Sequence, residues 1–304
     1  MQETIQKQIQ KLRTERDAII LAHNYQLPEV QDIADFRGDS LGLSREAAET
    51  EATVIVFCGV RFMAETASIL SPDKTVLVPA ENVGCPMVGM CPVEKLRQMK
   101  RENPDAVVVT YVNSSAAMKA ESDYCCTSAN AVDVVNSIPP GRPVIFVPDQ
   151  HLGSYVQEQT GRDLILHHGY CPTHARILVE DIERRLAEHP DAEVMVHPEC
   201  RPDVRGRADY VESTGGMCRR ARESEAEEMI VGTEIGLIYR LRDENPEKRF
   251  YSVSEAAICP NMKQIDLQKI LWSLEEMRYQ VEVPQKIRHQ ARKAVDRMVE
   301  AVPS

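Results

Sequence analysis

The chain has 304 residues, 43% of them hydrophobic, and a formal net charge of -11 at pH 7. This acidic balance argues against a nucleic-acid-binding surface, because clustered lysine and arginine side chains bind phosphate groups. The first residues are polar, and no run reaches the roughly 18 apolar residues of a membrane span, so we expect a cytoplasmic protein that binds neither membranes nor nucleic acid.

In chain order, helices are expected to alternate with short apolar strands. The first helix, Ile5–Arg16, is followed by a strand from Ala18, a polar loop, a helix over Ser40–Thr50, a strand from Val54, a helix over Met63–Leu70 and a strand from Val76. Near-continuous apolar character is typical of parallel strands that are covered on both faces. We therefore expect a small open α/β sheet in this part of the chain.

The same order of elements occurs twice more. The second pass has expected helices over Val93–Glu102, Ser128–Ser137 and Tyr155–Thr160, and strands from Ala106, Val144 and Leu164. The third has expected helices over Ala175–Glu188 and Thr214–Glu225, and strands from Ala192, Met229 and Phe250. Two further helices, Ile265–Tyr279 and Val283–Val299, are expected in the tail, the second with Pro284 near its first turn.

Three cysteines mark the repeat. Cys85, Cys171 and Cys259 are 86 and 88 residues apart, and each follows a predicted strand and precedes a proline. Other features recur at matching offsets, which indicates three homologous units. We expect three-layer αβα domains with small parallel sheets over residues 1–87, completed by the C-terminal helices of 265–304, over 88–173 and over 174–264. Units this small must pack together to bury enough surface, so we expect them to surround a pseudo-threefold axis with a central active site.

Polar side chains recur where the first strand of each unit ends. His23, Tyr111 and His197 stand six residues after the strand starts, Tyr25, Asn113 and Glu199 stand eight after, and Ser40, Ser128 and Thr214 open the next expected helices. Ligands of open α/β sheets gather beyond the carboxyl ends of the strands. Three units that meet at a centre would bring these side chains and the three cysteines into one cavity.

The repeated cysteines allow three interpretations. Structural zinc usually takes four protein ligands, commonly from closely spaced pairs. Iron-sulfur clusters are bound by cysteine thiolates, and one cysteine per unit would leave one iron of a four-iron cluster open to act as a Lewis acid. The third interpretation is that the cysteines are merely buried. A disulfide framework is not expected from nine cysteines, an odd number, in a reducing compartment.

The other cysteines are expected to be structural. Cys91 also precedes a proline, but it falls out of register with the repeat. Unpaired cysteines commonly pack in the core, and we expect this of Cys58, Cys125, Cys200 and Cys218. Cys126 is assigned no role, and His174 is expected either to support the cysteine ligands or to be structural.

Seven motifs resemble those of one enzyme family. They are H-N-Y-Q at 23–26, G-D-S-L around Ser40, V-F-C-G-V-x-F-M-A-E-T-A at 56–67, Y-V-N-S at 111–114, C-T-S-A-N at 126–130, P-D-x-x-L-G at 148–153 and V-H-P-E-C at 196–200. Long, ordered motifs of this kind over nearly the whole chain resemble the bacterial and archaeal quinolinate synthases.

The resemblance implies an iron-sulfur transferase of pyridine nucleotide biosynthesis. Such an enzyme condenses iminoaspartate with dihydroxyacetone phosphate to quinolinate, with release of phosphate and water, for the synthesis of NAD. The resemblance also implies one four-iron four-sulfur (4Fe-4S) cluster on Cys85, Cys171 and Cys259, with an open iron that contacts substrate. An L-aspartate oxidase or an aspartate dehydrogenase is the expected source of iminoaspartate.

The same resemblance assigns the residues of the pocket. They are His23, Tyr25, Ser40, Tyr111, Asn113, Ser128, His197, Glu199, Ser213 and Thr214. The reaction removes a carbon-bound proton and includes dehydrations, so it needs an acid and a base beside the open iron. We hypothesise that Glu199 and Tyr25 transfer these protons. Of the other catalytic residues, His23 and His197 would orient carboxylates. Tyr111, together with Asn113, would position the intermediate.

Anionic substrates need local attraction in an acidic protein. Helix N-termini provide free N–H groups and a partial positive charge. We expect Ser40, Ser128 and Thr214, together with Ser213, to open three helices directed at the cavity. The alternative is ordinary capping of these helices, whose loss costs about 1 kcal/mol of stability without a specific binding defect.

Three other functions remain open from the sequence. A diphthamide-type radical enzyme also draws three cysteines from three related domains, but it acts on a protein with S-adenosylmethionine. An open-iron hydro-lyase would share the Lewis-acid chemistry without a phosphate site. A non-catalytic iron or redox sensor would need no acid-base residues around the cluster.

Overall fold

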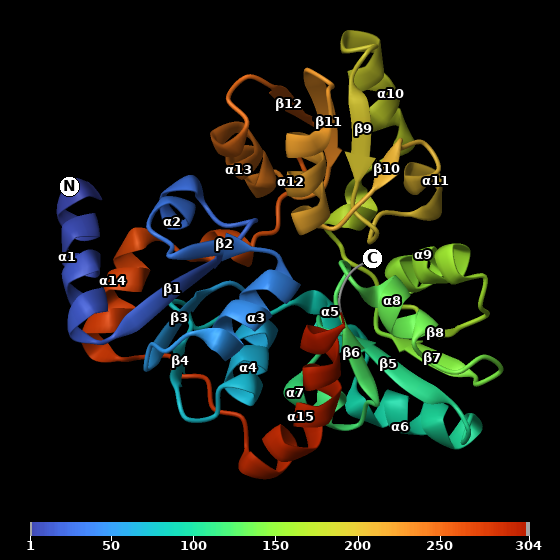
Figure 1. Cartoon of the computed structure of the whole chain (residues 1–304), viewed down its shortest axis with the longest axis horizontal. Helices are drawn as coiled ribbons and strands as arrows, with labels where there is room; N and C mark the ends of the chain where they lie inside the picture. Colours follow the sequence, from blue (N-terminus) through green and yellow to red (C-terminus); the bar gives the residue numbers. More distant parts are fainter. Residues whose placement is uncertain (1, 302–304) are drawn as a thin grey trace.

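The computed structural model describes residues 2–301. The predicted first and last ranges extend past this part at residue 1 and at residues 302–304, which lie outside the described residues. The described chain forms three four-stranded sheets whose paired strands all run parallel. In Figure 1 the sheets lie in three lobes around a common centre. The predicted α/β class with three parallel-sheet units is confirmed.

The three sheets have the same strand order. The first consists of β1 (Ala18–His23), β2 (Phe36–Gly38), β3 (Val54–Cys58) and β4 (Thr75–Leu77), in the order β2-β1-β3-β4. The second is β6-β5-β7-β8, from β5 (Val107–Tyr111), β6 (Tyr124–Cys126), β7 (Val144–Val147) and β8 (Ile165–Leu166). The third is β10-β9-β11-β12, from β9 (Glu193–Val196), β10 (Tyr210–Val211), β11 (Glu228–Gly232) and β12 (Arg249–Ser252).

Helices connect the strands of each unit. In the first unit they are α1 (Gln2–Glu15), α2 (Pro28–Asp32), α3 (Ser40–Glu49) and α4 (Arg61–Leu70). The second has α5 (Pro86–Met90), α6 (Val93–Glu102), α7 (Ala116–Ala120), α8 (Ala131–Asn136) and α9 (Gln150–Thr160). The third has η1 (His174–Arg176), α10 (Val179–Glu188), α11 (Pro202–Arg205), α12 (Thr214–Glu223) and α13 (Gly236–Glu244), and the tail has η2 (Met262–Gln264), α14 (Leu267–Glu276) and α15 (Gln285–Glu300).

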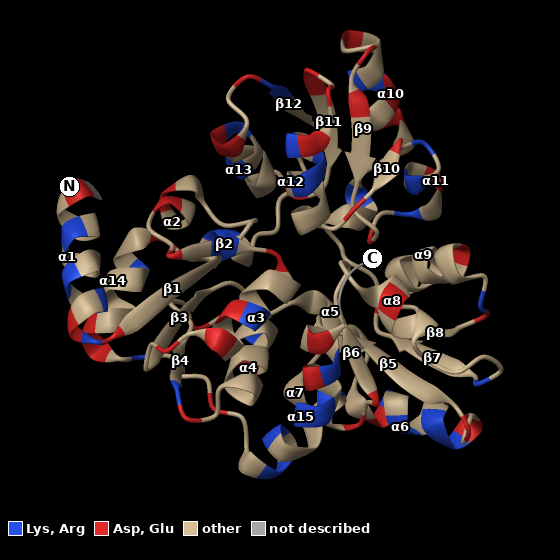
Figure 2. Cartoon of the chain, in the orientation of Figure 1, with Lys and Arg blue, Asp and Glu red and all other residues tan. Residues whose placement is uncertain are grey.

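One hydrophobic core runs through all three units. All five residues of β3 and all four of β7 are buried, as expected for strands that are covered on both faces. A single cluster of buried side chains includes Ile20, Phe146 and Met229, one from each sheet. Figure 2 shows the charged residues mainly on the helices and outer ends of the lobes. Among residues 2–301, no helix has the length and apolar character that crossing a membrane requires.

Each sheet has a short edge strand where the sequence predicts only a polar loop, so that prediction was wrong. These strands, β2, β6 and β10, have only two or three residues. Each follows an aspartate whose carboxylate accepts the N–H of a first-strand residue at 2.8 Å: Asp35 from Ile20, Asp123 from Val108 and Asp209 from Val194. The backbone N–H of each aspartate donates in turn to the carbonyl of the same residue. This reciprocal contact holds a strand that is too short to show an apolar pattern.

The prediction that Ser128 opens a helix was also wrong. Helix α8 begins at Ala131, and the Asn130 side chain accepts the backbone N–H of Thr127 at 2.8 Å, which holds the preceding turn. Ser128 therefore lies in a loop before the helix. The other two predicted starts agree with α3 and α12, but their capping side chains belong to the preceding residues, Asp39 and Ser213.

Both tail helices pack against the first unit, and one of them also reaches the second. Helix α14 contacts α1 and β3 of the first unit. Helix α15, the red helix of Figure 1, contacts α4 of the first unit and α7 and β6 of the second. Its last turn is held from both sides, because Arg45 donates to the Val299 carbonyl and Asn130 to the Met298 carbonyl. The tail therefore joins the first two units.

The aspartate contacts of the edge strands predict a stability effect. Asp123→Ala should lower the free energy of unfolding by about 1 kcal/mol, because it removes an acceptor with a charge from the Val108 N–H. Asp123→Asn should lose less, since the amide oxygen still accepts. Urea unfolding measures both changes. Glu183→Ala is the control, because it removes only an exposed pair with Arg207; an equal loss in that variant would contradict the special role of Asp123.

Candidate functional site

A cavity of about 220 Å³ lies where the three units meet. It is lined by twelve of the thirteen residues that the sequence analysis assigned to the site or to the cluster: His23, Tyr25, Ser40, Cys85, Tyr111, Asn113, Ser128, Cys171, His197, Glu199, Thr214 and Cys259. The exception is Ser213, which lines a neighbouring pocket together with Asp39 and Ser128. The sequence repeat therefore brings together side chains from all three units.

The strand ends place the polar side chains of the cavity. Strand β1 ends at His23, β5 ends at Tyr111, and His197 directly follows β9. In the first and third units the local geometry is the same. The N–H of Tyr25 donates to His23 Nδ1 at 3.2 Å, and the N–H of Glu199 donates to His197 Nδ1 at 3.3 Å.

These backbone contacts fix the tautomer of both rings. Because Nδ1 accepts, a neutral ring carries its proton on Nε2. In His197 this Nε2–H lies 3.1 Å from Ser128 Oγ and donates to it. Burial is the main cause that lowers the pKa of His23 and of His197 to about 3, so both rings are neutral near pH 7.

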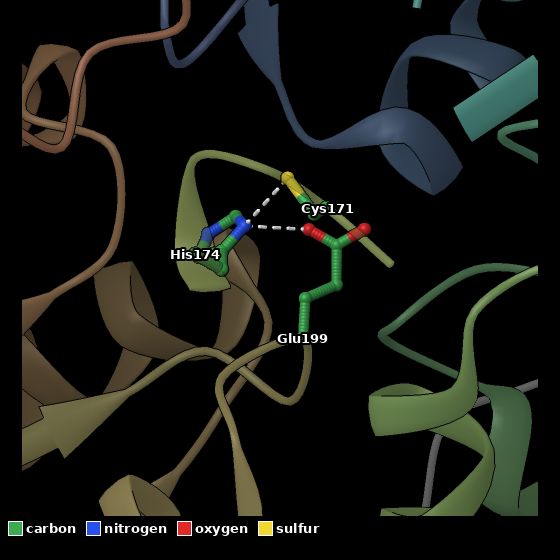
Figure 3. Close-up of side chains that lie close together, drawn as sticks. All are labelled: Cys171, His174 and Glu199. Atoms are coloured by element: carbon green, nitrogen blue, oxygen red, sulfur yellow. Dashed lines mark hydrogen bonds and ion pairs between the residues drawn. The ribbon is translucent and has the colours of Figure 1, made fainter. Parts of the chain in front are cut away.

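Glu199 is the carboxylate at the centre of the cavity. Figure 3 shows its side chain beside His174 and Cys171. Its Oε2 lies 2.7 Å from His174 Nδ1, and its Oε1 accepts from Asn113 Nδ2 at 3.4 Å. Burial alone would raise the pKa of Glu199, but His174, His197 and a hydrogen bond from Tyr111 outweigh it and lower this pKa. Glu199 is therefore ionised near pH 7 although only 3% of it is exposed.

His174 and Thr233 extend this network to Tyr25. His174 Nε2 lies 2.9 Å from Thr233 Oγ1, and the Tyr25 hydroxyl lies 2.6 Å from the same oxygen. Since His174 Nδ1 donates to Glu199, its Nε2 accepts in the neutral ring. A continuous path of polar atoms thus joins the Tyr25 hydroxyl to the Glu199 carboxylate. The sequence analysis left the role of His174 open and missed Thr233, because a lone threonine after a strand carries no distinctive signal.

The two tyrosines of the cavity stay protonated. Burial, and next the charge of Glu199, raise the pKa of Tyr25 and of Tyr111 well above the usual value. Both hydroxyls therefore act as hydrogen-bond donors near pH 7. With Glu199 ionised, the cavity combines this charged acceptor with the neutral O–H donors of Tyr25 and Tyr111.

Two helix N-termini reach the cavity wall. Ser40 and Thr214, the first residues of α3 and α12, both line the cavity. Asp39 caps α3 by accepting the Gly42 N–H, and Ser213 caps α12 by accepting the Gly216 N–H. The capping side chains leave the Ser40 and Thr214 hydroxyls available to other partners, and Thr214 Oγ1 accepts from Asn24 Nδ2 at 2.9 Å.

The cysteines fall into two groups by exposure. Cys85, Cys171 and Cys259 are half-buried and line the cavity, whereas the other six are buried. Cys91 packs with Leu96 and Met99 in a separate hydrophobic cluster. The out-of-register cysteine is thus part of a core, and the in-register three share one cavity.

The three thiols of the cavity fit a group that binds thiolates. Burial raises the pKa of Cys85 to about 12 and that of Cys171 well above its usual value, so neither ionises readily without a bound cation. Three thiols, one from each unit, in a single cavity match the ligands of an iron-sulfur cluster with one open iron. A second set of donors, Cys171 Sγ, His174 Nδ1 and a Glu199 oxygen, lies within 4.8 Å and has the ligand types of a single zinc ion.

Comparisons with known proteins match nearly the whole chain to one family. The family model described as quinolinate synthetase A protein (NadA) matches residues 7–300. A quinolinate synthase of Geobacter metallireducens is 55% identical over 301 residues, which cover 99% of this chain and 98% of the relative. One from Dehalococcoides mccartyi is 56% identical over 300 residues (99% of each), and one from Methanosarcina barkeri is 54% identical over 293 residues (96% of each).

The buried imidazoles predict a loss of stability in acid. Between the usual histidine pKa of 6.5 and the folded values of about 3, the unfolded chain binds more protons than the folded one. The free energy of unfolding should therefore be highest above pH 6.5 and fall as the pH decreases, by roughly 2 kcal/mol for each ring at about pH 5. Urea unfolding of the iron-free protein at several pH values measures this slope.

Two variants distinguish the effect of a buried histidine on the pH dependence from that of an exposed one. His23→Leu should lose part of the pH dependence, whereas His289→Leu, on the exposed side of α15, should keep it. A free energy of unfolding that stays constant down to pH 5 would contradict neutral buried rings at His23 and His197.

Proposed function

The chain belongs to the quinolinate synthase family and is an enzyme of NAD biosynthesis, and we propose that it condenses iminoaspartate with dihydroxyacetone phosphate to quinolinate. Phosphate and water leave in this reaction. The observation that carries the proposal is the cavity in which Cys85, Cys171 and Cys259, one from each unit, face the Glu199 network. Identities of 54 to 56% over nearly the whole chain support the same activity.

The three thiols would hold the 4Fe-4S cluster of the proposed enzyme. Its chemical contribution when bound is an iron without a protein ligand, which as a Lewis acid makes hydroxide a better leaving group. The donor set supports this assignment, because these three are the half-buried cysteines and each comes from a different unit. The protein itself then has to bind anions, exclude water and transfer protons.

Proton transfer is assigned to Glu199 and Tyr25. Glu199 is ionised and accepts a proton, and the neutral Tyr25 hydroxyl donates one. The polar path through Thr233 and His174 connects the two residues. A proton that returns from Glu199 to Tyr25 would enter His174 at Nδ1 and leave from Nε2, so this step requires the tautomer of His174 with its proton on Nε2. Neutral His23 and His197 would orient the substrate carboxylates through their Nε2 atoms.

Substrate positioning is assigned to residues of all three units. Tyr111 and Asn113 lie beside Glu199 and would position the intermediate. The N-termini of α3 and α12 supply N–H groups and partial positive charge at Ser40 and Thr214, which favours phosphate or carboxylate oxygens there. Ser128 would contribute through its contact with His197, and Ser213 by capping α12.

Three wider assignments accompany this function. The chain would divide at residues 87 and 173, with the C-terminal helices completing the first unit. The enzyme would work in the cytoplasm, where reducing conditions keep the nine cysteines out of disulfide bonds. An L-aspartate oxidase or an aspartate dehydrogenase would supply iminoaspartate, which is too unstable to accumulate.

A direct assay tests the proposed reaction. The anaerobically reconstituted protein, given dihydroxyacetone phosphate and enzymatically generated iminoaspartate, should form quinolinate. Activity should vanish in air and return after reconstitution with iron and sulfide, because an open iron is exposed to oxygen. Replacement of Cys85, Cys171 or Cys259 by alanine should abolish the cluster and the activity, whereas Cys91→Ala should retain both.

The outcomes of this assay separate the alternatives. Cleavage of S-adenosylmethionine without quinolinate would indicate a radical enzyme, and dehydration of a hydroxy acid alone would indicate a hydro-lyase. A cluster without turnover of either kind would indicate a sensor. Loss of the cluster in Cys91→Ala, with retention in one of the other three variants, would overturn the ligand assignment.

The role of Glu199 predicts a specific loss of turnover. Glu199→Gln should keep the cluster absorption, because the residue is not assigned as a ligand, and lower kcat at least about 100-fold, because an amide does not accept the proton. Steady-state kinetics and the visible spectrum measure the two effects. Glu183→Gln, which alters only an exposed pair with Arg207, is the control; near-normal kcat in Glu199→Gln would remove Glu199 from the mechanism.

A further inference from the structure

A buried ion pair lies behind the cavity, between the first and third units. Glu234 is fully buried, and only 19% of the Lys263 side chain is exposed. Lys263 Nζ lies 3.0 Å from Glu234 Oε1 and 3.1 Å from Oε2. Neither residue belongs to the site described above. Removal of one partner of such a pair strongly destabilises the folded protein, because the other charge then stays buried without an opposite charge beside it.

Both residues also hold the backbone of the site. Glu234 Oε1 accepts the N–H of Cys259 at 3.1 Å. Lys263 Nζ donates to the carbonyl oxygen of Tyr25, which is 238 residues away in the sequence. The pair therefore connects the backbone of one proposed cluster ligand to the backbone of the proposed acid.

Gly236 shows how closely these groups are packed. Its N–H donates to Glu234 Oε2 at 2.7 Å. A Cβ atom on Gly236 would lie 2.7 Å from Lys263 Nζ, 2.8 Å from Glu234 Oε2 and 2.8 Å from the Tyr25 carbonyl oxygen. Any side chain at this position would therefore collide with all three partners at once, which explains the glycine without any special backbone angle.

The second unit has a buried acidic residue at the corresponding position, but no lysine among residues 2–301 is paired with it. Glu234 stands two residues after β11, and Asp149 stands two residues after β7. Asp149 is fully buried, and its Oδ1 accepts the N–H groups of His151 and Leu152, while burial and next the charge of Glu199 raise its pKa well above the usual value. A buried carboxylate thus faces the cysteine segment in two units, while the first unit has Val60 at this position. The lysine link to another unit is specific to Glu234.

We propose that Glu234 and Lys263 are positioning residues that couple the Cys259 segment of the third unit to the Tyr25 turn of the first. The pair holds both backbones in one geometry, so that the ligand and the acid keep a fixed separation. The positive charge of Lys263 also supports the neutral state of His23, whose pKa is lowered first by burial and next by this charge. The roles of Cys259 as a ligand and of Tyr25 as an acid rest on the proposed function, but the coupling between their two segments does not.

Hydrogen exchange of the iron-free, full-length protein tests the coupling. Lys263→Met should speed amide exchange about tenfold or more in two separate segments, 24–28 and 255–262, because both lose a fixed partner. Lys269→Met is the matched control. Lys269 contacts the Gln264 carbonyl and Asp266 in the same part of the tail but does not reach the first unit. This control should leave both segments at the wild-type rate.

Two further variants keep the test decisive if Lys263→Met does not fold. Glu234→Gln with Lys263→Met removes both charges together, so it avoids an unpaired buried charge while still breaking the link. Gly236→Ala should disturb the same two segments through its Cβ atom. Wild-type exchange in either segment, or an equal increase throughout the third unit, would overturn the proposal.

A spectroscopic measurement separates positioning from mere stability. In the reconstituted protein, Lys263→Met should shift the electron paramagnetic resonance spectrum of the reduced cluster and lower kcat more than it changes KM, whereas Lys269→Met should do neither. An unchanged spectrum with an unchanged kcat would reduce the pair to a structural contact. Absence of quinolinate from the wild type would instead overturn the proposed function and leave the exchange result standing.

Discussion

The carboxyl ends of β1, β5 and β9 meet at one cavity, and the polar groups placed there lose most of their water. Removal of water disfavours charge, so His23 and His197 stay neutral and Tyr25 keeps its proton. Glu199 remains charged because several donors surround its carboxylate. The geometry of the three sheets therefore sets the protonation states on which acid-base chemistry depends.

The same convergence joins the three units in one large hydrophobic cluster, and the second and third units each have a smaller cluster as well. A sheet of four short strands buries little surface alone, and a shared hydrophobic cluster with the tail helix α15 provides the rest. The junctions between units also carry buried polar contacts, such as the pair of Glu234 with Lys263. Contacts across the junctions thus stabilise both the site and the fold.

Repetition made much of the architecture predictable from the sequence. Apolar strands and cysteines that recur in register identified three units, and His23 and Glu199 could be placed at or just beyond strand ends. The edge strands were missed because two or three residues carry no apolar period. An aspartate that stands seventeen residues after each predicted start of a first strand, as Asp123 stands after Ala106, was a usable signal. Thr233 and the lysine link were missed because they depend on contacts between distant segments, which no local pattern encodes.

The central claim is that one cysteine from each unit holds a single cluster in the shared cavity. Anomalous scattering at the iron edge from anaerobic crystals of the reconstituted protein tests it directly. We expect one compact iron site in direct contact with Cys85, Cys171 and Cys259 and away from Cys91. A single metal ion held by Cys171, His174 and Glu199, with the other two thiols unbound, would contradict it.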